Sequence, residues 1–226
     1  MSKQIFALIG TDTEIGKTYS CCRILEYLVT VGKKVSGLKP IASGVLETPL
    51  GVINSDSYAH YQASNVKLTI DKITPFCFKE AIAPHIAAIN EDVDLNSTIV
   101  ADKINSSIAA SEAEIILVEG VGGLMVPLNY QETYLDLLKR LGLPIILVVG
   151  VKLGCLNHAL LTNHVLLNHG LKPVGFIANC LDKAMPYQVE NIATLEKMLS
   201  CDLLATINYG GGIEPSAKFN QVFGLQ

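Results

Sequence analysis

The chain has 226 residues, a formal net charge of −4 and an apolar content of 50%. This size and composition predict one α/β domain over residues 1–226, with a core large enough to be covered on both faces. The acidic balance, without a cluster of lysines and arginines, excludes a nucleic-acid-binding surface. No run approaches the roughly 18 apolar residues of a membrane span, and the N-terminus has no signal-peptide pattern. We therefore expect a cytoplasmic protein in which the six scattered cysteines remain free thiols.

Short apolar runs alternate with helical patterns along most of the chain, which predicts a mainly parallel, twisted sheet flanked by helices on both faces. Several runs are almost continuously hydrophobic, as strands buried on both faces must be. The tail after Gly212 is weakly patterned. The expected strands are 4–9, 35–38, 115–118, 144–149, 174–178 and 203–207, and the expected helices after the first are 97–110, 133–141, 156–169 and 189–199.

The run 10–18, Gly-Thr-Asp-Thr-Glu-Ile-Gly-Lys-Thr, lies between the first strand and a helix that ends near Gly32. A strand, a glycine-containing turn and Gly-Lys-Thr at a helix start are typical of a phosphate-binding loop. Backbone N–H groups and the helix dipole favour phosphate there, Lys17 would reach the β- and γ-phosphates, and Thr18 would ligate Mg²⁺. The first glycine, Gly10, stands one position earlier than in the standard pattern. The sequence thus predicts a P-loop NTPase fold.

The residues that follow the strands are the next candidates, because ligands of parallel sheets gather at the carboxyl ends of the strands. Glu119 ends an apolar strand, where a carboxylate ligand of Mg²⁺ would stand. Asp56 is either a second such ligand or a helix cap. Lys39, held extended by Pro40, either neutralises charge on a transferring phosphate or is a solvated loop residue. Asn179 is either a residue that contacts the base or a simple turn residue, and the lysine typical of guanine recognition is missing after it.

The five histidines have no metal-ligand spacing. Three of them, His158, His164 and His169, share one expected helix without an i, i+4 pair, so we expect them at the surface or at its boundary with the core. His85 lies in a loop-like Ala-Pro-His stretch and is less easily assigned to the surface.

Six segments at or beside the expected strand ends carry a resemblance to a known enzyme family. They are 10–18, 37–44, 54–56, 84–85, 118–123 and 148–159. The Lys-Pro-x-x-Ser-Gly pattern in the second and the Val-Lys-Leu-Gly-Cys pattern in the last are specific, whereas the phosphate loop alone is not. Together the segments resemble the ATP-dependent dethiobiotin synthetases of biotin biosynthesis, and the resemblance extends to about Asn179. The displaced Gly10 is also this family's form.

The resemblance implies a homodimeric enzyme that closes the ureido ring of dethiobiotin. Its substrates would be 7,8-diaminopelargonate, CO2 and ATP with Mg²⁺, and its products dethiobiotin, ADP and phosphate. One amine would first capture CO2 as a carbamate. The γ-phosphate would then move to the carbamate oxygen, and the second amine would finally attack the carbonyl and displace phosphate.

Site residues follow from the resemblance by position. Lys39 would be the catalytic lysine, and with Lys17 it would favour the carbamate anion beside ATP. The expected metal ligands are Thr18, Asp56 and Glu119. The expected nucleotide-binding residues are Glu14, Ile15, Gly16, Lys17, Thr18, Tyr19, Asp56, Glu119, Gly120, Val121, Gly122, Asn179, Cys180, Asn208, Tyr209 and Gly210. The diamine or its carbamate would contact Thr13, Lys39 and Ser43, while its distal carboxylate would be held, from the partner subunit, by a helix start that comprises Gly154, Cys155, Leu156 and Asn157.

One segment departs from the family pattern, and it bears on nucleotide selectivity. The family tends to carry a proline-containing loop over the purine, whereas this chain has Ile-Asn-Tyr-Gly-Gly-Gly at 207–212.

Three other functions fit the sequence less well. A deviant-Walker ATPase switch that acts on a protein partner would carry an additional lysine early in the phosphate loop, where this chain has Gly10, Thr11 and Asp12. A glutamine-dependent amidase would bring a glutaminase domain, for which the chain is too short. An inactive nucleotide-binding module is disfavoured because the expected lysines and metal ligands are all present.

Overall fold

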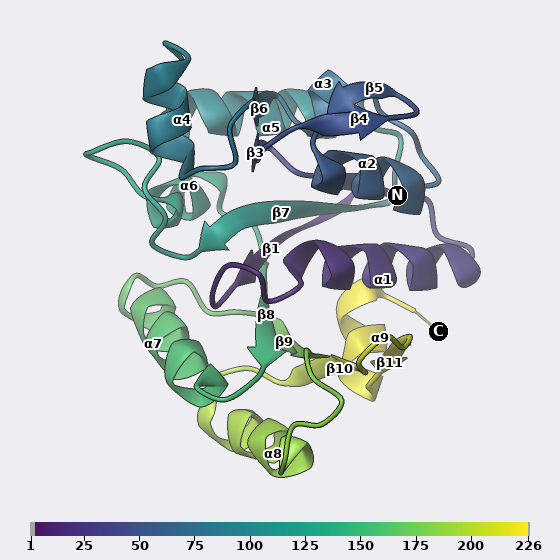
Figure 1. Ribbon diagram of the computed structural model, residues 1–226. Coiled ribbons are helices and arrows are strands. Elements are labelled where there is room, and N and C mark those ends of the chain that lie inside the picture. Colours follow the sequence, from purple (N-terminus) through teal and green to yellow (C-terminus); the bar gives the residue numbers. More distant parts are fainter. Residues whose placement is uncertain (1–2, 226) are drawn as a thin grey trace.

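The computed structural model describes residues 3–225, which form a seven-stranded sheet with helices on both sides (Figure 1). All neighbouring strands run parallel except the last pair, β10 and β11. In spatial order the strands are β11 (Ile213–Pro215), β10 (Leu203–Ile207), β9 (Gly175–Cys180), β8 (Ile145–Val151), β1 (Gln4–Gly10), β7 (Ile115–Gly123) and β2 (Val35–Leu38).

Side chains of successive strand residues point to opposite faces, so the sheet separates two apolar cores. In β1, Ala7 and Ile9 join one core, and Phe6 and Leu8 join the other. The helices that contribute buried side chains to the first core include α5 (Ser97–Ala110), α6 (Tyr134–Leu141), α7 (Cys155–Asn168) and α8 (Gln188–Met198), and those of the second include α1 (Lys17–Thr30) and α9 (Ala217–Phe223).

The predicted strands and helices are confirmed, with bounds that move by one or two residues in most cases. The largest difference is β7, which continues past the expected Val118 to Gly123. The weakly patterned tail is ordered as β11 and α9, and its Phe219 and Phe223 are buried. Figure 1 shows α9 beside α1, where the rings of Tyr27 and Phe219 lie 5.5 Å apart.

The segment between β2 and β7 contains short elements that the sequence patterns did not predict. Strands of three residues carry too little periodicity to be recognised. They are β3 (Ile41–Ser43), which pairs parallel with β6 (Phe76–Phe78), and β4 (Leu46–Thr48), which pairs antiparallel with β5 (Gly51–Ile53); the helices are α2 (Ser55–Ala63), α3 (Ile70–Ile73) and α4 (Pro84–Asn90).

Asn54 connects two of these elements above the sheet. Its side-chain oxygen accepts a hydrogen bond from the backbone N–H of Asp56 at 2.9 Å and caps α2. Its amide nitrogen donates to the backbone oxygens of Ser43, at 3.1 Å, and Gly44, at 2.7 Å. The helix cap therefore fixes Asp56 and Ser43 relative to each other.

The six cysteines, all within residues 3–225, are free thiols as predicted. In the same range, no helix combines the length and apolar character needed to cross a bilayer.

Candidate active site

The phosphate loop connects β1 to α1, as the sequence predicts. Its last residue, Gly16, has a φ of +75°, a left-handed conformation that glycine adopts without strain. Asn179, at the end of β9, donates a hydrogen bond from its amide nitrogen to the Ile15 backbone oxygen at 2.8 Å. A Cβ at Gly16 would lie 2.2 Å from that nitrogen. Only a glycine at position 16 therefore leaves room for the Asn179 side chain to bond to the loop.

The displaced first glycine has a structural reason. A Cβ at Gly10 would lie 2.7 Å from Cδ of Lys17, so the side chain of Lys17 passes directly over this position. The Lys17 ammonium then donates to the Asp12 backbone oxygen at 2.7 Å. Burial, together with the like charge of Lys39, lowers the pKa of Lys17 to about 8.

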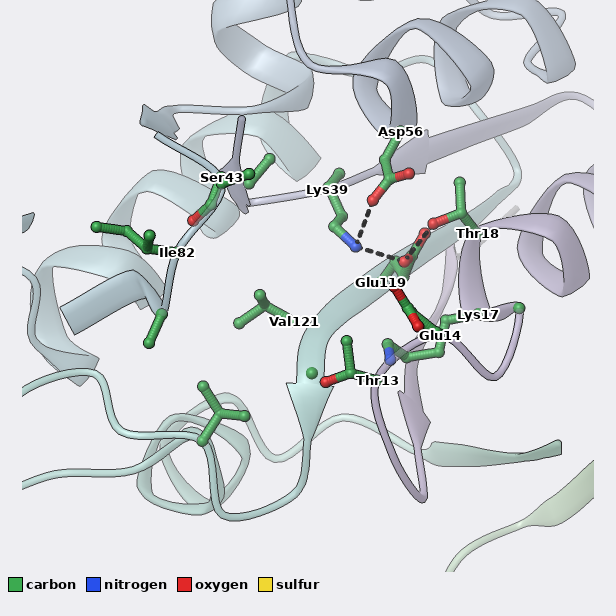
Figure 2. A pocket seen from close by; sticks show the side chains of 16 residues that line it. Thr13, Glu14, Lys17, Thr18, Lys39, Ser43, Asp56, Ile82, Glu119 and Val121 are labelled. Carbon is green, nitrogen blue, oxygen red and sulfur yellow. Dashed lines mark hydrogen bonds and ion pairs between the residues drawn. The ribbon is translucent and has the colours of Figure 1, made fainter. Parts of the chain in front are cut away.

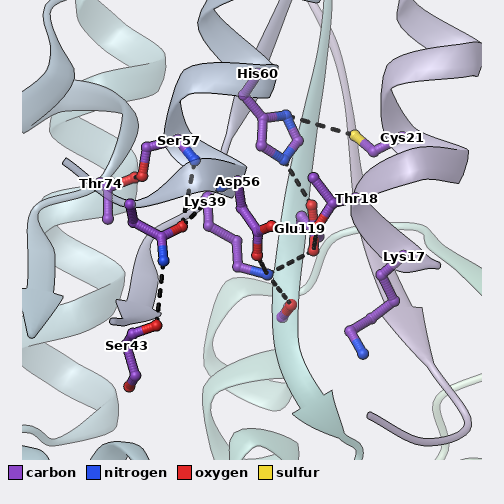
Figure 3. Close-up of polar contacts among 12 residues, drawn as sticks. Lys17, Thr18, Cys21, Lys39, Ser43, Asp56, Ser57, His60, Thr74 and Glu119 are labelled. Carbon is purple, nitrogen blue, oxygen red and sulfur yellow. Dashed lines mark hydrogen bonds and ion pairs between the residues drawn. The ribbon is translucent and has the colours of Figure 1, made fainter. Parts of the chain in front are cut away.

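Lys39 lies at the centre of a buried cluster of charged side chains (Figures 2 and 3). Its ammonium is 2.5 Å from Oε1 of Glu119, 3.0 Å from Oδ2 of Asp56 and 3.3 Å from the backbone oxygen of Gly120. Lys39 is 4% exposed and Glu119 is 1% exposed. The alternative of a solvated loop lysine is therefore wrong.

Lys39 and Glu119 keep each other charged. Burial alone would lower the pKa of Lys39, but the nearby Glu119 and Asp56 carboxylates outweigh it and raise that pKa. Burial alone would raise the pKa of Glu119, but the Lys39 ammonium and a hydrogen bond from His60 outweigh it and lower that pKa to about 2. Both groups are thus ionised at neutral pH, and removal of either would leave an uncompensated buried charge.

The three predicted metal ligands are gathered around this cluster. Thr18 donates from its hydroxyl to Oε1 of Glu119 at 2.8 Å, and Asp56 approaches from the first turn of α2. The alternative that Asp56 is itself the helix cap is wrong, because Asn54 fills that position. Two carboxylates and a hydroxyl beside a phosphate loop form a donor set that suits Mg²⁺, which binds through one or two carboxylates and phosphate oxygens.

These side chains border a cleft of about 840 Å³ at the carboxyl end of the sheet. Among the described residues, the Ser43 hydroxyl has no hydrogen-bond partner, although it is buried at the cleft wall. The cleft is lined by Thr13, Glu14, Gly16, Lys17, Thr18, Lys39, Ala42, Ser43, Asp56, Ala81, Ile82, Ala83, Glu119, Val121, Gly122 and Val126.

The predicted residues on the other side of the sheet edge do not line this cleft. Tyr19 donates from its hydroxyl to the backbone oxygen of Gly211 at 2.8 Å, which ties α1 to the loop after β10. In that loop Tyr209 is 61% exposed, and the Asn208 amide donates to Oε1 of Glu214 at 2.6 Å. Ile15 and Gly120 are buried and do not line the cleft, and Cys180 is buried at the end of β9.

The predicted carboxylate-binding helix start does not line the cleft of its own chain. It lies near the phosphate loop, since Nδ1 of His158 is 3.6 Å from Oδ2 of Asp12. Gly154 is the N-cap of α7, and Cys155, Leu156 and Asn157 form its first turn. The preceding Leu153 is 96% exposed.

The surface histidines were predicted correctly, but one functional candidate was missed. His158, His164 and His169 have partly or fully exposed side chains. His60, in contrast, is fully buried, and its Nε2 lies 2.6 Å from Oε2 of Glu119. It lies one helical turn after Asp56, so a predicted helix over 55–63 would have placed both on one face.

The other histidine in question, His85, lies in the first turn of α4. Its ring packs edge-on against Tyr130, with centroids 6.0 Å apart, and among the described residues its Nδ1 is buried without a hydrogen-bond partner.

The fold and the loop define a P-loop nucleotide-binding protein. A family described as "AAA domain" matches residues 4–217. Among solved structures, the septum site-determining protein MinD of Pyrococcus horikoshii, complexed with Mg-ADP, aligns with a TM-score of 0.56 at 18% identity over 98% of this chain and 93% of that one. A ParA family ATPase of Chlorobium tepidum gives a TM-score of 0.52 at 16% identity over 92% and 84%. These likenesses show the fold alone.

Sequence relatives narrow the class. The chain is 42% identical to the ATP-dependent dethiobiotin synthetase BioD of Cellvibrio japonicus, over 92% of this chain and 90% of the relative. It is 42% identical to that of Legionella pneumophila strain Corby, over 92% and 95%, and 39% identical to that of Aromatoleum aromaticum, over 92% of each. The chain belongs to the ATP-dependent dethiobiotin synthetase family.

Proposed function

We propose that this protein, acting in the cytoplasm, converts 7,8-diaminopelargonate, CO2 and ATP with Mg²⁺ into dethiobiotin, ADP and phosphate. One observation carries the proposal. The Lys39 ammonium, which its acidic neighbours keep charged, lies in a single cleft with the phosphate loop on one side and Ser43 on the other. Family membership supports the same reaction, and the cleft volume of about 840 Å³ suits small-molecule substrates.

The first step is capture of CO2. A neutral amine of the substrate attacks the carbon of CO2 and loses a proton, which converts an uncharged group into a carbamate anion. Lys17 and Lys39 stabilise the anionic product because both ammonium groups face the cleft. Thr13 would contact the diamine or its carbamate, and so would the Ser43 hydroxyl, which has no hydrogen-bond partner among residues 3–225.

Phosphoryl transfer and ring closure follow. The γ-phosphoryl group of ATP is transferred to a carbamate oxygen, which releases ADP and forms a carbamic–phosphoric anhydride. The second amine attacks the carbonyl carbon, loses a proton and expels phosphate, which closes the ureido ring. Lys17 and the backbone N–H groups at the start of α1 hold the phosphates during these steps.

Thr18, Asp56 and Glu119 would hold Mg²⁺, which when bound neutralises charge on the phosphate oxygens. Glu119 is prepared for this role because it stays ionised although it is buried. Lys39 keeps that carboxylate in place until the metal and nucleotide arrive.

Two further parts of the proposal concern the ends of the substrates. Asn179, Cys180 and residues 208–210 would surround the base, at the sheet edge beyond Tyr19. The start of α7, with Gly154 and Asn157, would hold the distal carboxylate of a diamine bound to the partner subunit of a homodimer. The absence of this helix start from the lining of its own cleft and the exposed Leu153 beside it support that arrangement.

The test is a reconstituted reaction. Purified protein, diaminopelargonate, bicarbonate and MgATP are mixed, and dethiobiotin is detected by mass together with ADP. We expect product only when all components are present. ATP hydrolysis that needs neither the diamine nor bicarbonate, without dethiobiotin, would contradict the proposal and favour an ATPase that acts on a protein partner.

A further inference from the structure

His60 connects to the side of Glu119 that faces away from the cleft. The imidazole comes from α2, and its Nε2 lies 2.6 Å from Oε2 of Glu119 (Figure 3). The other carboxylate oxygen, Oε1, accepts from the Lys39 ammonium at 2.5 Å and from the Thr18 hydroxyl at 2.8 Å. Each oxygen of Glu119 therefore has its own donors, and the carboxylate cannot rotate without loss of one set.

The direction of the hydrogen bond follows from the charge of Glu119. An ionised carboxylate only accepts, so the hydrogen lies on Nε2 of His60. The other ring nitrogen, Nδ1, is 3.8 Å from Sγ of Cys21 on α1. Burial raises the pKa of the Cys21 thiol well above its ordinary value, so the thiol keeps its hydrogen beside Nδ1. The three side chains form one chain of hydrogen bonds, from Cys21 through His60 to Glu119.

The fold leaves space for the imidazole. A Cβ at Gly37, in β2, would lie 2.3 Å from Nδ1 of His60, so a glycine is needed where the ring crosses the strand. The backbone oxygen of His60 accepts from both the N–H of Ser64, at 3.1 Å, and its hydroxyl, at 2.7 Å. Ring and backbone are thus both held, and the ring has a single position between α2 and β7.

We propose that His60 is a positioning residue, which fixes Oε2 of Glu119 so that Oε1 faces Thr18 and Lys39 in the orientation that receives the metal. This inference rests on the proposed function, in which Glu119 ligates Mg²⁺. Ligating carboxylates are commonly held by a second hydrogen-bond partner, whose loss costs about 10- to 100-fold in metal affinity or activity.

Cys21, His60 and Glu119 also bring three ligand atoms within 4.8 Å of one another. A transition-metal site is nevertheless disfavoured. Two donors bound to one zinc ion at tetrahedral geometry lie about 3.3 Å apart, given metal–ligand distances of about 2.0 Å. The contact of 2.6 Å between His60 and Glu119 is shorter and corresponds to a hydrogen bond.

The test compares His60→Gln with His60→Asn. The glutamine amide nitrogen reaches the place of Nε2 and keeps a donor for Glu119, whereas the shorter asparagine does not. Binding of Mn²⁺, as a paramagnetic substitute for Mg²⁺, is titrated by electron paramagnetic resonance with a non-hydrolysable ATP analogue present. We expect His60→Asn to weaken Mn²⁺ binding by about 10- to 100-fold and His60→Gln by about threefold at most.

Two other variants complete the design. Cys21→Ala keeps the contact between His60 and Glu119, so we expect Mn²⁺ binding within about threefold of the wild type. His60→Leu fills the site without a donor, carries the same expectation as His60→Asn, and replaces it if that variant does not fold.

The outcomes separate this inference from the proposed function. If His60→Asn or its replacement binds Mn²⁺ as the wild type does, or if His60→Gln is as weak as His60→Asn, the positioning role is wrong. Normal Mn²⁺ binding by Glu119→Gln would also overturn it. If the expected order of variants holds but the wild type makes no dethiobiotin, the proposed reaction alone fails.

Discussion

Two parts of the same sheet edge differ in how firmly their side chains are held. Over β2 and β7, Lys39 and Glu119 are almost fully buried, and each has several charged or hydrogen-bonded partners. Beyond β9, residues 208–212 are largely exposed, and a single hydrogen bond from Tyr19 ties the loop to α1.

The difference indicates that the groups proposed for the chemistry are in place before substrates bind. Fixed charges lower a barrier without reorganisation, which is the main way an active site stabilises developing charge. The loop 208–212, proposed to contact the base, has fewer interactions that fix its position. Substitutions should therefore have large effects over β2 and β7, and small effects beyond β9.

The largest effect is expected for Lys39→Ala. Loss of one preorganised cationic donor should lower kcat by at least about 100- to 1000-fold, while MgATP still binds to the phosphate loop. Turnover is measured as dethiobiotin formed, and binding by titration with a fluorescent ATP analogue.

A folding control accompanies Lys39→Ala, because the buried Glu119 carboxylate loses its partner at a cost of about 3–5 kcal/mol. Thermal unfolding identifies any loss of structure, and Lys39→Gln offers a polar replacement that fills the same space. Unchanged turnover in a folded variant would remove Lys39 from the catalytic role.

The next largest effect is expected for Glu119→Gln. The amide is a weaker ligand for a hard cation than a carboxylate, so we expect the Mg²⁺ concentration for half-maximal turnover to rise by about 10-fold or more. The measurement is the rate of dethiobiotin synthesis against Mg²⁺ at saturating ATP. An unaltered metal titration would count against Glu119 as a ligand.

Gly10→Ala tests the displaced glycine of the phosphate loop. The added Cβ would lie 2.7 Å from Cδ of Lys17 and would push that side chain from its path. Loss of one charge-assisted contact to phosphate predicts an ATP affinity lower by about 10-fold, which corresponds to about 1.4 kcal/mol.

The matched control for Gly10→Ala is Gly212→Ala on the exposed side. A Cβ there would meet no atom of residues 3–225 within 4 Å, its chain neighbours aside, so ATP affinity should not change. Equal losses of ATP affinity in Gly10→Ala and Gly212→Ala would mean that the phosphate loop and the loop after β10 are held equally firmly.

The smallest effect is expected for Tyr209→Ala. The side chain is 61% exposed, so we expect the KM for ATP to change by about twofold or less, in line with other exposed substitutions. The KM values for ATP and GTP are compared in parallel. A large rise for ATP alone would show that this loop holds the base firmly, so that the two parts of the sheet edge are equally important for binding.

Much of this protein follows from local sequence patterns. The apolar runs locate the six parallel strands, because strands buried on both faces must be hydrophobic throughout. The phosphate loop is recognisable because strand, turn and helix are contiguous in the chain. The rule that ligands gather at carboxyl ends of parallel strands then singles out Lys39 and Glu119, which lie 2.5 Å apart.

The tertiary structure decided the rest, for two physical reasons. Short elements such as β3 and β6 have no periodicity of their own and form only when a neighbouring segment supplies hydrogen bonds. The same holds for the tail, where Phe219 and Phe223 are ordered by burial against α1 and β1.

The second reason concerns the charged cluster. Glu119 is separated in sequence by 80 residues from Lys39 and by 59 from His60. Whether a buried charge is tolerated depends on partners that only folding brings within hydrogen-bond distance. The sequence alone therefore determined which residues could do chemistry, and the packing of α2 and β2 against β7 decided how they are charged and oriented.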